Sequence, residues 1–175
     1  MALLIALLPV NLLLALLLRT LQGPGVMFFQ KRAGLHGEPF KLVKFRTMRD
    51  LRDSEGCLLD DDARVTSIGT FLRKTRLDEL PSFWNVFTGD LAFVGPRPLL
   101  PSTIAALGER GVKRGAVRPG LTGWAQINGN TLLSLDEKVE LDIWFIENRR
   151  WFTNPVIIAS TIWVMIAGEK RRRTR

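Results

Sequence analysis

The first residues of this chain are apolar without a helical or strand period. Residues 1–18 (MALLIALLPVNLLLALLL) contain one polar side chain, Asn11, and one proline, Pro9. A segment that is apolar on every side is not a surface helix of a soluble domain. Its 18 residues lie at the lower limit for crossing a bilayer, which takes about 20 residues in a helix. Pro9 lies near its middle, where the lost hydrogen bond predicts a kink.

This segment has three interpretations. A signal peptide needs basic residues before the apolar run, yet the first Lys or Arg is Arg19, and no small-residue cleavage site follows. Two forms remain open: a straight spanning helix, and a helix broken at Pro9 that enters and leaves on the same face. Positive charge is dense from Arg19 onward, so the body of the chain is expected on the cytoplasmic side in either membrane form.

After this segment, apolar and polar residues alternate as they do in strands. Residues 26–30 (VMFFQ) and 40–48 (FKLVKFRTM) predict a hairpin around a glycine-containing turn over 31–38. The basic side of the second strand, which carries Lys44, is either an ordinary solvated face or a surface that faces phosphate.

Helix spacing begins again after a polar, acidic stretch. Residues 67–76 predict a short helix, and apolar positions 77, 80, 83, 84 and 87 predict a second one. Pro81 is tolerated only in a first turn, so Asp78 is expected at or near the N-cap, with Glu79 just inside. Asp followed by Glu is also a common helix start, so the pair alone does not establish a functional site.

Later segments complete the expected fold. Further helices are predicted over 101–114, 132–151 and 156–167, with an extended run at 91–94. The pattern predicts an α/β fold, mostly α with short strands, in a membrane-associated protein. Its expected parts are a membrane helix over 1–21, a compact catalytic domain over 22–151, and an interfacial helix with a basic tail over 152–175. The tail is either an anionic-lipid contact or a disordered solubilising end.

Charge and cysteine content narrow the partners. The 175-residue chain has a net charge of +8, which admits nucleic acid, an anionic membrane or phosphorylated small molecules as partners. The single cysteine, Cys57, excludes an internal disulfide and any cysteine-rich metal site.

The candidate chemistry centres on the carboxylate pair Asp78–Glu79. Arg73 and Arg76 precede it, and Arg97 follows in a stiff Gly-Pro-Arg-Pro loop. Carboxylates among arginines suit chemistry on an anionic substrate, because one carboxylate can attack or hold a metal while arginines offset phosphate charge.

Two other features could belong to a site. The glycine-rich residues 117–129, with Arg118 among them, either let backbone approach a ligand closely or form a compact structural turn. Asp142 lies close to an otherwise apolar stripe of the helix predicted over 132–151.

Four segments carry a specific resemblance. They read QKRAGLHGEPFKLVKFRTM, LDELPSFWNVFTGDLAFVGPRPLL, VRPGLTGWAQINGN and VELDIWF. In this order they resemble the bacterial sugar transferases, the monotopic polyprenyl-phosphate phosphoglycosyl transferases of the small single-domain type. The resemblance extends from about Arg19 to Trp151, with the apolar N-terminus also in place.

The resemblance implies a reaction and roles. The family moves sugar-1-phosphate from a UDP-sugar to undecaprenyl phosphate and releases UMP, through a covalent aspartyl phosphosugar and with Mg²⁺. This is the first membrane step in assembly of a glycan such as exopolysaccharide, O-antigen or glycoprotein. Carried over to this chain, Asp78 is the nucleophile and Mg²⁺ contact, and Glu79 is its partner. The expected substrate-binding residues are Lys44, Arg73, Arg76, Arg97, Arg118, Gln126 and Asp142.

This sequence departs from the family pattern at two places. The family's re-entrant helix is broken at a Ser-Pro pair, whereas this chain has Leu8–Pro9 and begins eight residues before Pro9. We expect a re-entrant broken helix, with a truncated start as one interpretation. Asn130 stands where many relatives have Arg, which leaves the donor preference open.

Partners and alternatives follow from the same residues. We expect a UDP-sugar donor, a polyprenyl phosphate acceptor and anionic membrane lipids as partners, and no nucleic acid; a homodimer is left open. One alternative is a binding module that holds nucleic acid or anionic lipid without catalysis. Another is an inactive, truncated transferase that keeps the fold and binds a UDP-sugar.

Overall fold

The computed structural model describes residues 2–170 and divides into two compact units. The first unit is Met1–Phe29 with Val43–Trp84, and the second is Gln30–Leu42 with Asn85–Arg175. The predicted hairpin is confirmed: β1 (Met27–Ala33) pairs with β2 (Pro39–Phe45), and each strand has residues in both units. The functional division at residues 21 and 151 stays a prediction, and the end of the basic tail lies outside the described residues.

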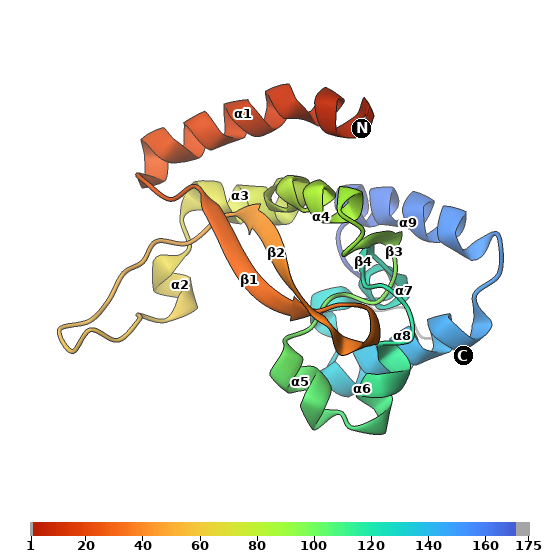
Figure 1. The fold of residues 1–175 in the computed structure, drawn as a ribbon. Helices are drawn as coiled ribbons and strands as arrows, with labels where there is room; N and C mark the ends of the chain where they lie inside the picture. Colours follow the sequence, from red (N-terminus) through yellow and green to blue (C-terminus); the bar gives the residue numbers. More distant parts are fainter. Residues whose placement is uncertain (1, 171–175) are drawn as a thin grey trace. The chain divides into compact units, whose positions relative to one another are not determined.

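The first unit is built from helices around one apolar cluster. In it, Leu14 and Leu18 pack with Phe45 and Leu72, and all four side chains are at least nine-tenths buried. Its helices are α1 (Ala2–Gln22), α2 (Asp61–Arg64), α3 (Ser67–Thr75), the 3₁₀ helix η2 (Leu77–Ser82) and the start of α4 (Phe83–Phe87) (Figure 1).

The N-terminal segment is one helix, with Pro9 inside it. The break predicted at Pro9 is therefore not seen, and the re-entrant course stays a proposal. Proline removes one N–H from the helix and crowds the preceding turn. The Asn11 side chain lies at this turn, and its Nδ2 donates to the carbonyl of Leu7 at 3.0 Å. This bond does not replace the one that Pro9 removes, because that bond would reach the carbonyl of Ile5.

Length and exposure suit α1 to a membrane. Residues Leu4–Gln22 are long and apolar enough to cross one, and only 11% of that window is buried. A core helix of a soluble protein would be mostly buried, although an N-terminal signal sequence passes the same test. Leu12, Leu13 and Leu16 are each more than 60% exposed, so this face of the helix is an apolar surface of the kind that marks a membrane or protein contact.

The helix that carries the carboxylate pair differs from the prediction. The α3 helix over 67–76 is confirmed, and it ends at Arg76, whose left-handed φ of 56° turns the chain. Arg76 is at once the last cap of α3 and the first cap of η2, so Asp78 is the second residue of a 3₁₀ helix. The prediction that Asp78 lies at or near an N-cap is therefore right only in that Asp78 lies in the first turn; the N-cap is Arg76, and the helix is 3₁₀ rather than α. At the other end of η2, Ser82 Oγ donates to the Val43 carbonyl at 2.6 Å.

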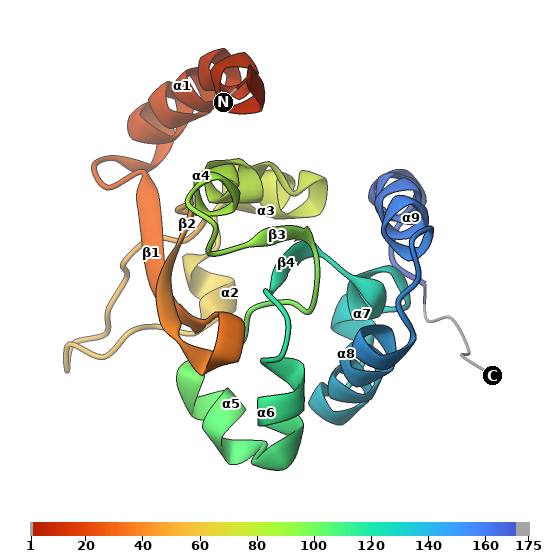
Figure 2. The same cartoon turned by 45° about the vertical axis from the view of Figure 1, so that its right-hand side comes forward.

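The second unit holds most of the remaining elements. They are η1 (Leu35–Gly37), β3 (Ala92–Val94), α5 (Pro101–Ala106), α6 (Glu109–Arg114), β4 (Gly120–Thr122), α7 (Trp124–Ile127), η3 (Asn130–Leu132), α8 (Leu135–Asn148) and α9 (Thr153–Ala167) (Figure 2). Ile127, Phe145 and Ile157, from α7, α8 and α9, form its apolar cluster, and each is at most 3% exposed.

The helices of the second unit follow the predictions with two corrections. The single helix expected over 101–114 is two helices, because the chain turns at Gly108, where φ is 55°. The next helix begins at residue 135 rather than 132, because Ser134 and Glu137 form a capping box there. The last helix is confirmed, and Trp163 and Ile166 remain 62% and 78% exposed on it, as an interfacial helix requires.

The glycine-rich segment serves backbone packing. Its residues 120–122 form β4, parallel to β3, with Ala92 opposite Gly120. The N–H of Gly120 donates to the Pro96 carbonyl at 2.9 Å. A Cβ on Gly120 would lie 2.1 Å from Gly95 N, and one on Gly123 would lie 2.1 Å from Gly95 O. The structural interpretation of these glycines is therefore favoured over close approach to a ligand.

Replacement of Gly123 by alanine should destabilise the second unit. The added methyl group meets backbone, which cannot move aside as a side chain can, so we expect a loss of about 1–3 kcal/mol or more in unfolding free energy. Thermal unfolding in detergent measures the loss. Gly115→Ala is the matched control, because its Cβ would meet nothing closer than 3.4 Å. Equal melting temperatures of the two variants would contradict the packing argument.

Candidate active site

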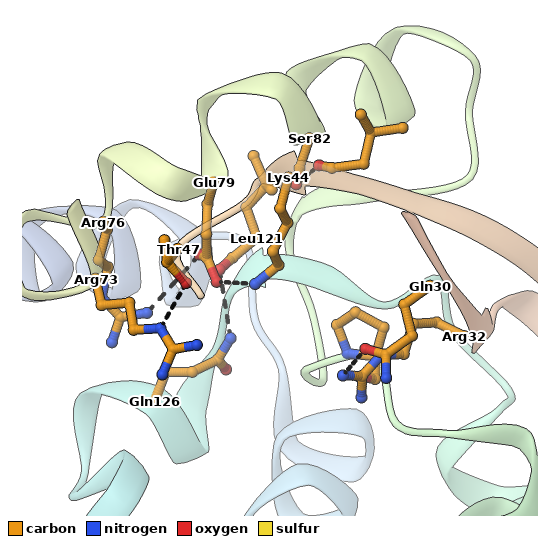
Figure 3. A network of polar contacts seen from close by, with 12 residues as sticks. Gln30, Arg32, Lys44, Thr47, Arg73, Arg76, Glu79, Ser82, Leu121 and Gln126 are labelled. Carbon is orange, nitrogen blue, oxygen red and sulfur yellow. Dashed lines mark hydrogen bonds and ion pairs between the residues drawn. The ribbon is translucent and has the colours of Figure 1, made fainter. Parts of the chain in front are cut away.

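The carboxylate pair lies among cations of its own unit. Glu79 Oε1 is 2.6 Å from Lys44 Nζ, and these side chains are 15% and 17% exposed (Figure 3). The other oxygen of Glu79 lies 3.9 Å from Arg76 Nη1. The charge of Glu79 is therefore already shared by two cations, which fixes its side chain.

Asp78 has a different environment on the same helix. Its side chain is 9% exposed. Successive side chains of a 3₁₀ helix are about 120° apart, because there are three residues per turn. Asp78 and Glu79 thus leave η2 in different directions, and the two carboxylates are suited to different tasks.

Arg73 is held beside this pair from a third element. Its Nε donates to Thr47 Oγ1 at 2.8 Å, just beyond the end of β2 (Figure 3). The structure thus brings together, on β2, α3 and η2, five residues that the sequence nominated: Lys44, Arg73, Arg76, Asp78 and Glu79. Local sequence could not show that Lys44, 35 residues away, pairs with Glu79.

In the second unit, a buried ion pair supports the loop of Arg97. Arg114 of α6 and Asp142 of α8 are 5% and 1% exposed, and their side chains meet at 2.8 Å. Arg114 Nη2 also donates to the carbonyl of Arg97. Sequence reasoning missed Arg114, because nothing nearby distinguishes this buried arginine from its less buried neighbours Arg110 and Lys113.

Burial sets the titration of Asp142. It raises the pKa of this carboxyl from 3.8 to about 6, and Arg114 offsets the rise only in part. Oδ1 of Asp142 is buried without a hydrogen-bond partner among residues 2–170. In this structure Asp142 supports the loop through Arg114, and its predicted contact with substrate stays a prediction.

The other nominated residues of this unit lie at two different depths. Arg118 is exposed and lines, with Arg149, Phe145 and Val94, an open cavity of about 310 Å³. Gln126 is 2% exposed, and its Nε2 lies 3.4 Å from the Leu121 carbonyl. Arg118 is thus accessible to a ligand, whereas Gln126 is placed as a support for the β4–α7 turn.

The C-terminal end of α9 is fastened to the turn that contains Asn130. Asn130 Nδ2 donates to Glu169 Oε1 at 2.5 Å, and the Thr131 N–H donates to the other oxygen at 3.2 Å. Asn130 adopts a positive φ of 43° there. This residue therefore has a structural partner in this chain.

The carboxylates fit magnesium only in part. Among the described residues, no three of His, Cys, Asp or Glu gather closely enough to hold an ion by themselves. Mg²⁺ is commonly bound by one or two carboxylates, and its shell is completed by water and substrate phosphates. Asp78, the predicted Mg²⁺ contact, would supply one such carboxylate.

Comparison with known proteins gives the class. The bacterial sugar transferase family profile matches residues 1–168. Over 152 residues, the chain is 47% identical to "Uncharacterized sugar transferase EpsL" of Bacillus subtilis (strain 168), covering 87% of this chain and 75% of that protein. The chain therefore belongs to the bacterial sugar transferase family. This membership confirms the resemblance and the prediction of a phosphoglycosyl transferase enzyme.

Two further relatives differ in how much of their own length the matched residues cover. "UDP-glucose:undecaprenyl-phosphate glucose-1-phosphate transferase" of Escherichia coli (strain K12) is 43% identical over 142 residues, which cover 75% of this chain but 30% of that protein. "Exopolysaccharide production protein ExoY" of Rhizobium meliloti (strain 1021) is 34% identical over 171 residues, covering 88% and 76%. The chain thus spans about three quarters of the length of the Bacillus subtilis and Rhizobium meliloti relatives, and under a third of the length of the Escherichia coli relative.

Removal of one member of the buried pair should be costly. Asp142→Leu leaves Arg114 buried without its carboxylate, and we expect a loss of about 3–5 kcal/mol in unfolding free energy. The double variant Arg114→Met/Asp142→Leu should recover much of it. The exposed pair Arg110–Asp136, at 2.9 Å, is the control, and its loss should change stability by less than about 1 kcal/mol. Denaturant unfolding of the wild-type protein and of these three variants measures the effects; equal effects at both pairs would contradict the burial argument.

The raised pKa of Asp142 gives a pH dependence with a defined sign. Between about pH 4 and pH 6 the folded protein holds this proton and the unfolded chain has lost it. The contribution of this group to stability is therefore greatest below about pH 4 and declines as pH rises through about 6. The stability difference between pH 4 and pH 7 should shrink in Arg114→Met/Asp142→Leu, measured by melting temperature. An unchanged profile would mean that Asp142 titrates normally.

Proposed function

We propose that this chain transfers sugar-1-phosphate from a UDP-sugar to undecaprenyl phosphate and releases UMP. The proposal rests above all on Asp78 and Glu79 on η2, beside Lys44, Arg73 and Arg76 of the same unit. The printed names of relatives support it. One in Aeromonas hydrophila, 36% identical over 170 residues, is "UDP-N-acetylgalactosamine-undecaprenyl-phosphate N-acetylgalactosaminephosphotransferase". Since that name and the Escherichia coli one differ in sugar, the family leaves the donor sugar of this chain open.

Two displacements at one phosphorus account for the reaction. An oxygen of the Asp78 carboxylate attacks the phosphorus that carries the sugar, and the bond from that phosphorus to UMP breaks. UMP leaves with the bonding electron pair, and the phosphosugar remains on Asp78. An oxygen of undecaprenyl phosphate then attacks the same phosphorus, the bond to Asp78 breaks, and the carboxylate is restored.

The surroundings of the two carboxylates support this division of roles. Glu79 is engaged by Lys44 at 2.6 Å, and Arg76 lies at 3.9 Å, which suits it to hold cations in place rather than to attack. Arg73 and Arg76 offset charge on a diphosphate, which is the main requirement of phosphoryl transfer. Asp78 would hold Mg²⁺, with water and substrate oxygens completing its coordination, and the ion would neutralise diphosphate charge when bound.

The lipid acceptor explains the membrane features. A polyprenyl chain is available only in a bilayer, and α1 has the length and exposed leucines to enter one. We place the catalytic residues on the cytoplasmic face of the inner membrane, with anionic lipids around the basic segments. The name of the Rhizobium meliloti relative favours exopolysaccharide as the product glycan.

Release of UMP tests the proposal. Purified protein in nanodiscs with Mg²⁺, undecaprenyl phosphate and a panel of UDP-sugars should release UMP with at least one donor. Asp78→Asn should lower the rate by about 1,000-fold or more, because an amide cannot replace the nucleophile. Asp62→Asn, on an exposed residue, is the control.

The covalent step has its own readout. Without acceptor, the wild-type protein should release about one equivalent of UMP and gain the mass of one sugar phosphate on Asp78. A steady rate that needs both substrates at once, with no mass gain, would exclude the covalent route. No UMP from any donor would instead favour the binding-module or inactive-transferase alternatives.

A further inference from the structure

Two arginines from outside α1 bind the carbonyl groups at its C-terminal end. Arg46 Nη2 donates to the carbonyls of Gln22 and Pro24 at 3.3 and 2.5 Å. Arg49 Nη2 donates to the carbonyl of Leu21 at 3.4 Å. The last carbonyls of a helix have no partner within the helix, and a cation there also interacts favourably with the helix dipole. The end of α1 is therefore attached to a segment 24 to 28 residues further along the chain.

This attachment is more than a helix cap. The chain turns just after α1 at Gly23, whose φ of 82° is the usual left-handed way to end a helix. Arg46 is not needed for that turn, and its position is unfavourable: its Nε is buried without a hydrogen-bond partner among residues 2–170, as are both polar atoms of the Gln22 side chain. The fold thus keeps buried polar groups without partners at this place, which indicates a requirement beyond stability.

Arg46 belongs to a stretch of four consecutive residues that hold the candidate site. Lys44 binds Glu79 at 2.6 Å, and Thr47 Oγ1 accepts a hydrogen bond from an arginine of α3 at 2.8 Å (Figure 3). Phe45, between Lys44 and Arg46, is 1% exposed and packs with leucines of α1 and α3. Because four residues of chain have little slack, the end of α1 and the carboxylate pair on η2 are held at a fixed position relative to each other.

We infer that Arg46 is a positioning residue for the lipid acceptor. The inference rests on the proposed function, in which the phosphate of undecaprenyl phosphate lies at the surface of the bilayer that holds its tail. Reaction with that phosphate requires Asp78 at one depth relative to the bilayer, and α1, as the helix that enters the membrane, sets this depth for its unit. Arg46 links the two, since it holds the end of α1 to the residues that order the site. The UDP-sugar arrives from water, so its reaction requires no such depth.

The two half-reactions separate this role from a purely structural one. In nanodiscs, Arg46→Met should release the first equivalent of UMP within about twofold of the wild-type rate. Its turnover with undecaprenyl phosphate should fall by about tenfold or more, because a small misplacement of reacting groups is costly. With a short-chain, water-soluble prenyl phosphate the loss should largely disappear, since that acceptor can reach the site at any depth. Arg46→Lys, which keeps a cation that can bind one carbonyl, should lie between Arg46→Met and the wild-type protein.

Arg52→Met is the matched control. Arg52 is exposed, and its Nη1 donates to the carbonyl of Gly56 at 2.8 Å, so the same side chain is removed from a carbonyl that is not part of α1. Both acceptors should react with this variant at the wild-type rate. If Arg46→Met does not fold, Arg49→Met replaces it: loss of the longer contact to Leu21 should lower turnover several-fold with undecaprenyl phosphate alone.

A distance measurement tests the link without any reaction. Spin labels on Leu13→Cys of α1 and Lys74→Cys of α3, both at exposed positions, in a Cys57→Ser background, should give a narrow distance distribution that Arg46→Met broadens. An unchanged distribution would overturn the inference, as would an equal loss with both acceptors or no loss with either. Absence of UMP release from the wild-type protein would refute the proposed transfer and with it the role toward the acceptor, and the distances then decide separately whether Arg46 holds α1.

Discussion

The close approach of three glycines sets the geometry of the second unit. Gly95, Gly120 and Gly123 leave no room for a β-carbon, so the strands β3 and β4 and the loop after β3 come together backbone to backbone. That contact fixes the loop of Arg97 from one side. The buried Arg114–Asp142 pair fixes it from the other, through the Arg97 carbonyl. The loop is thus rigid because two independent constraints meet on it.

The first unit solves a different problem, which is to hold carboxylates in an ordered arrangement beside the proposed anionic substrate. Lys44 and Arg76 are committed to Glu79, and Arg73 is committed to a hydroxyl. Each cation therefore has a fixed position before any substrate arrives. Preorganised charges of this kind stabilise a transition state without first having to reorganise, which is where electrostatic catalysis gains most. The cations around Glu79 therefore serve to fix charges in position before the reaction.

Sequence alone predicted what depends on local pattern. The hairpin, α3, α9 and the Asp78–Glu79 pair were all visible in spacing, turns and motif, and the family followed from four segments read in order. The errors have a common physical origin in tertiary context: a helix continues through Pro9, and Arg76 ends one helix and begins another. The long-range ion pairs of Arg114 and Lys44 could not be predicted from the sequence either, because they depend on residues about 30 positions away.

The parallel pairing of β3 and β4 has a consequence for the order in which the protein is made. Strands of this kind can meet only after the whole connection between them exists, so β3 leaves the ribosome well before its partner. The helix α1 lies earlier in the chain than β3 and is synthesised long before Gly120 and Asp142. Under the proposed function, α1 is therefore available to a bilayer while the loop of Arg97 still has no fixed shape, and anchoring precedes competence to react.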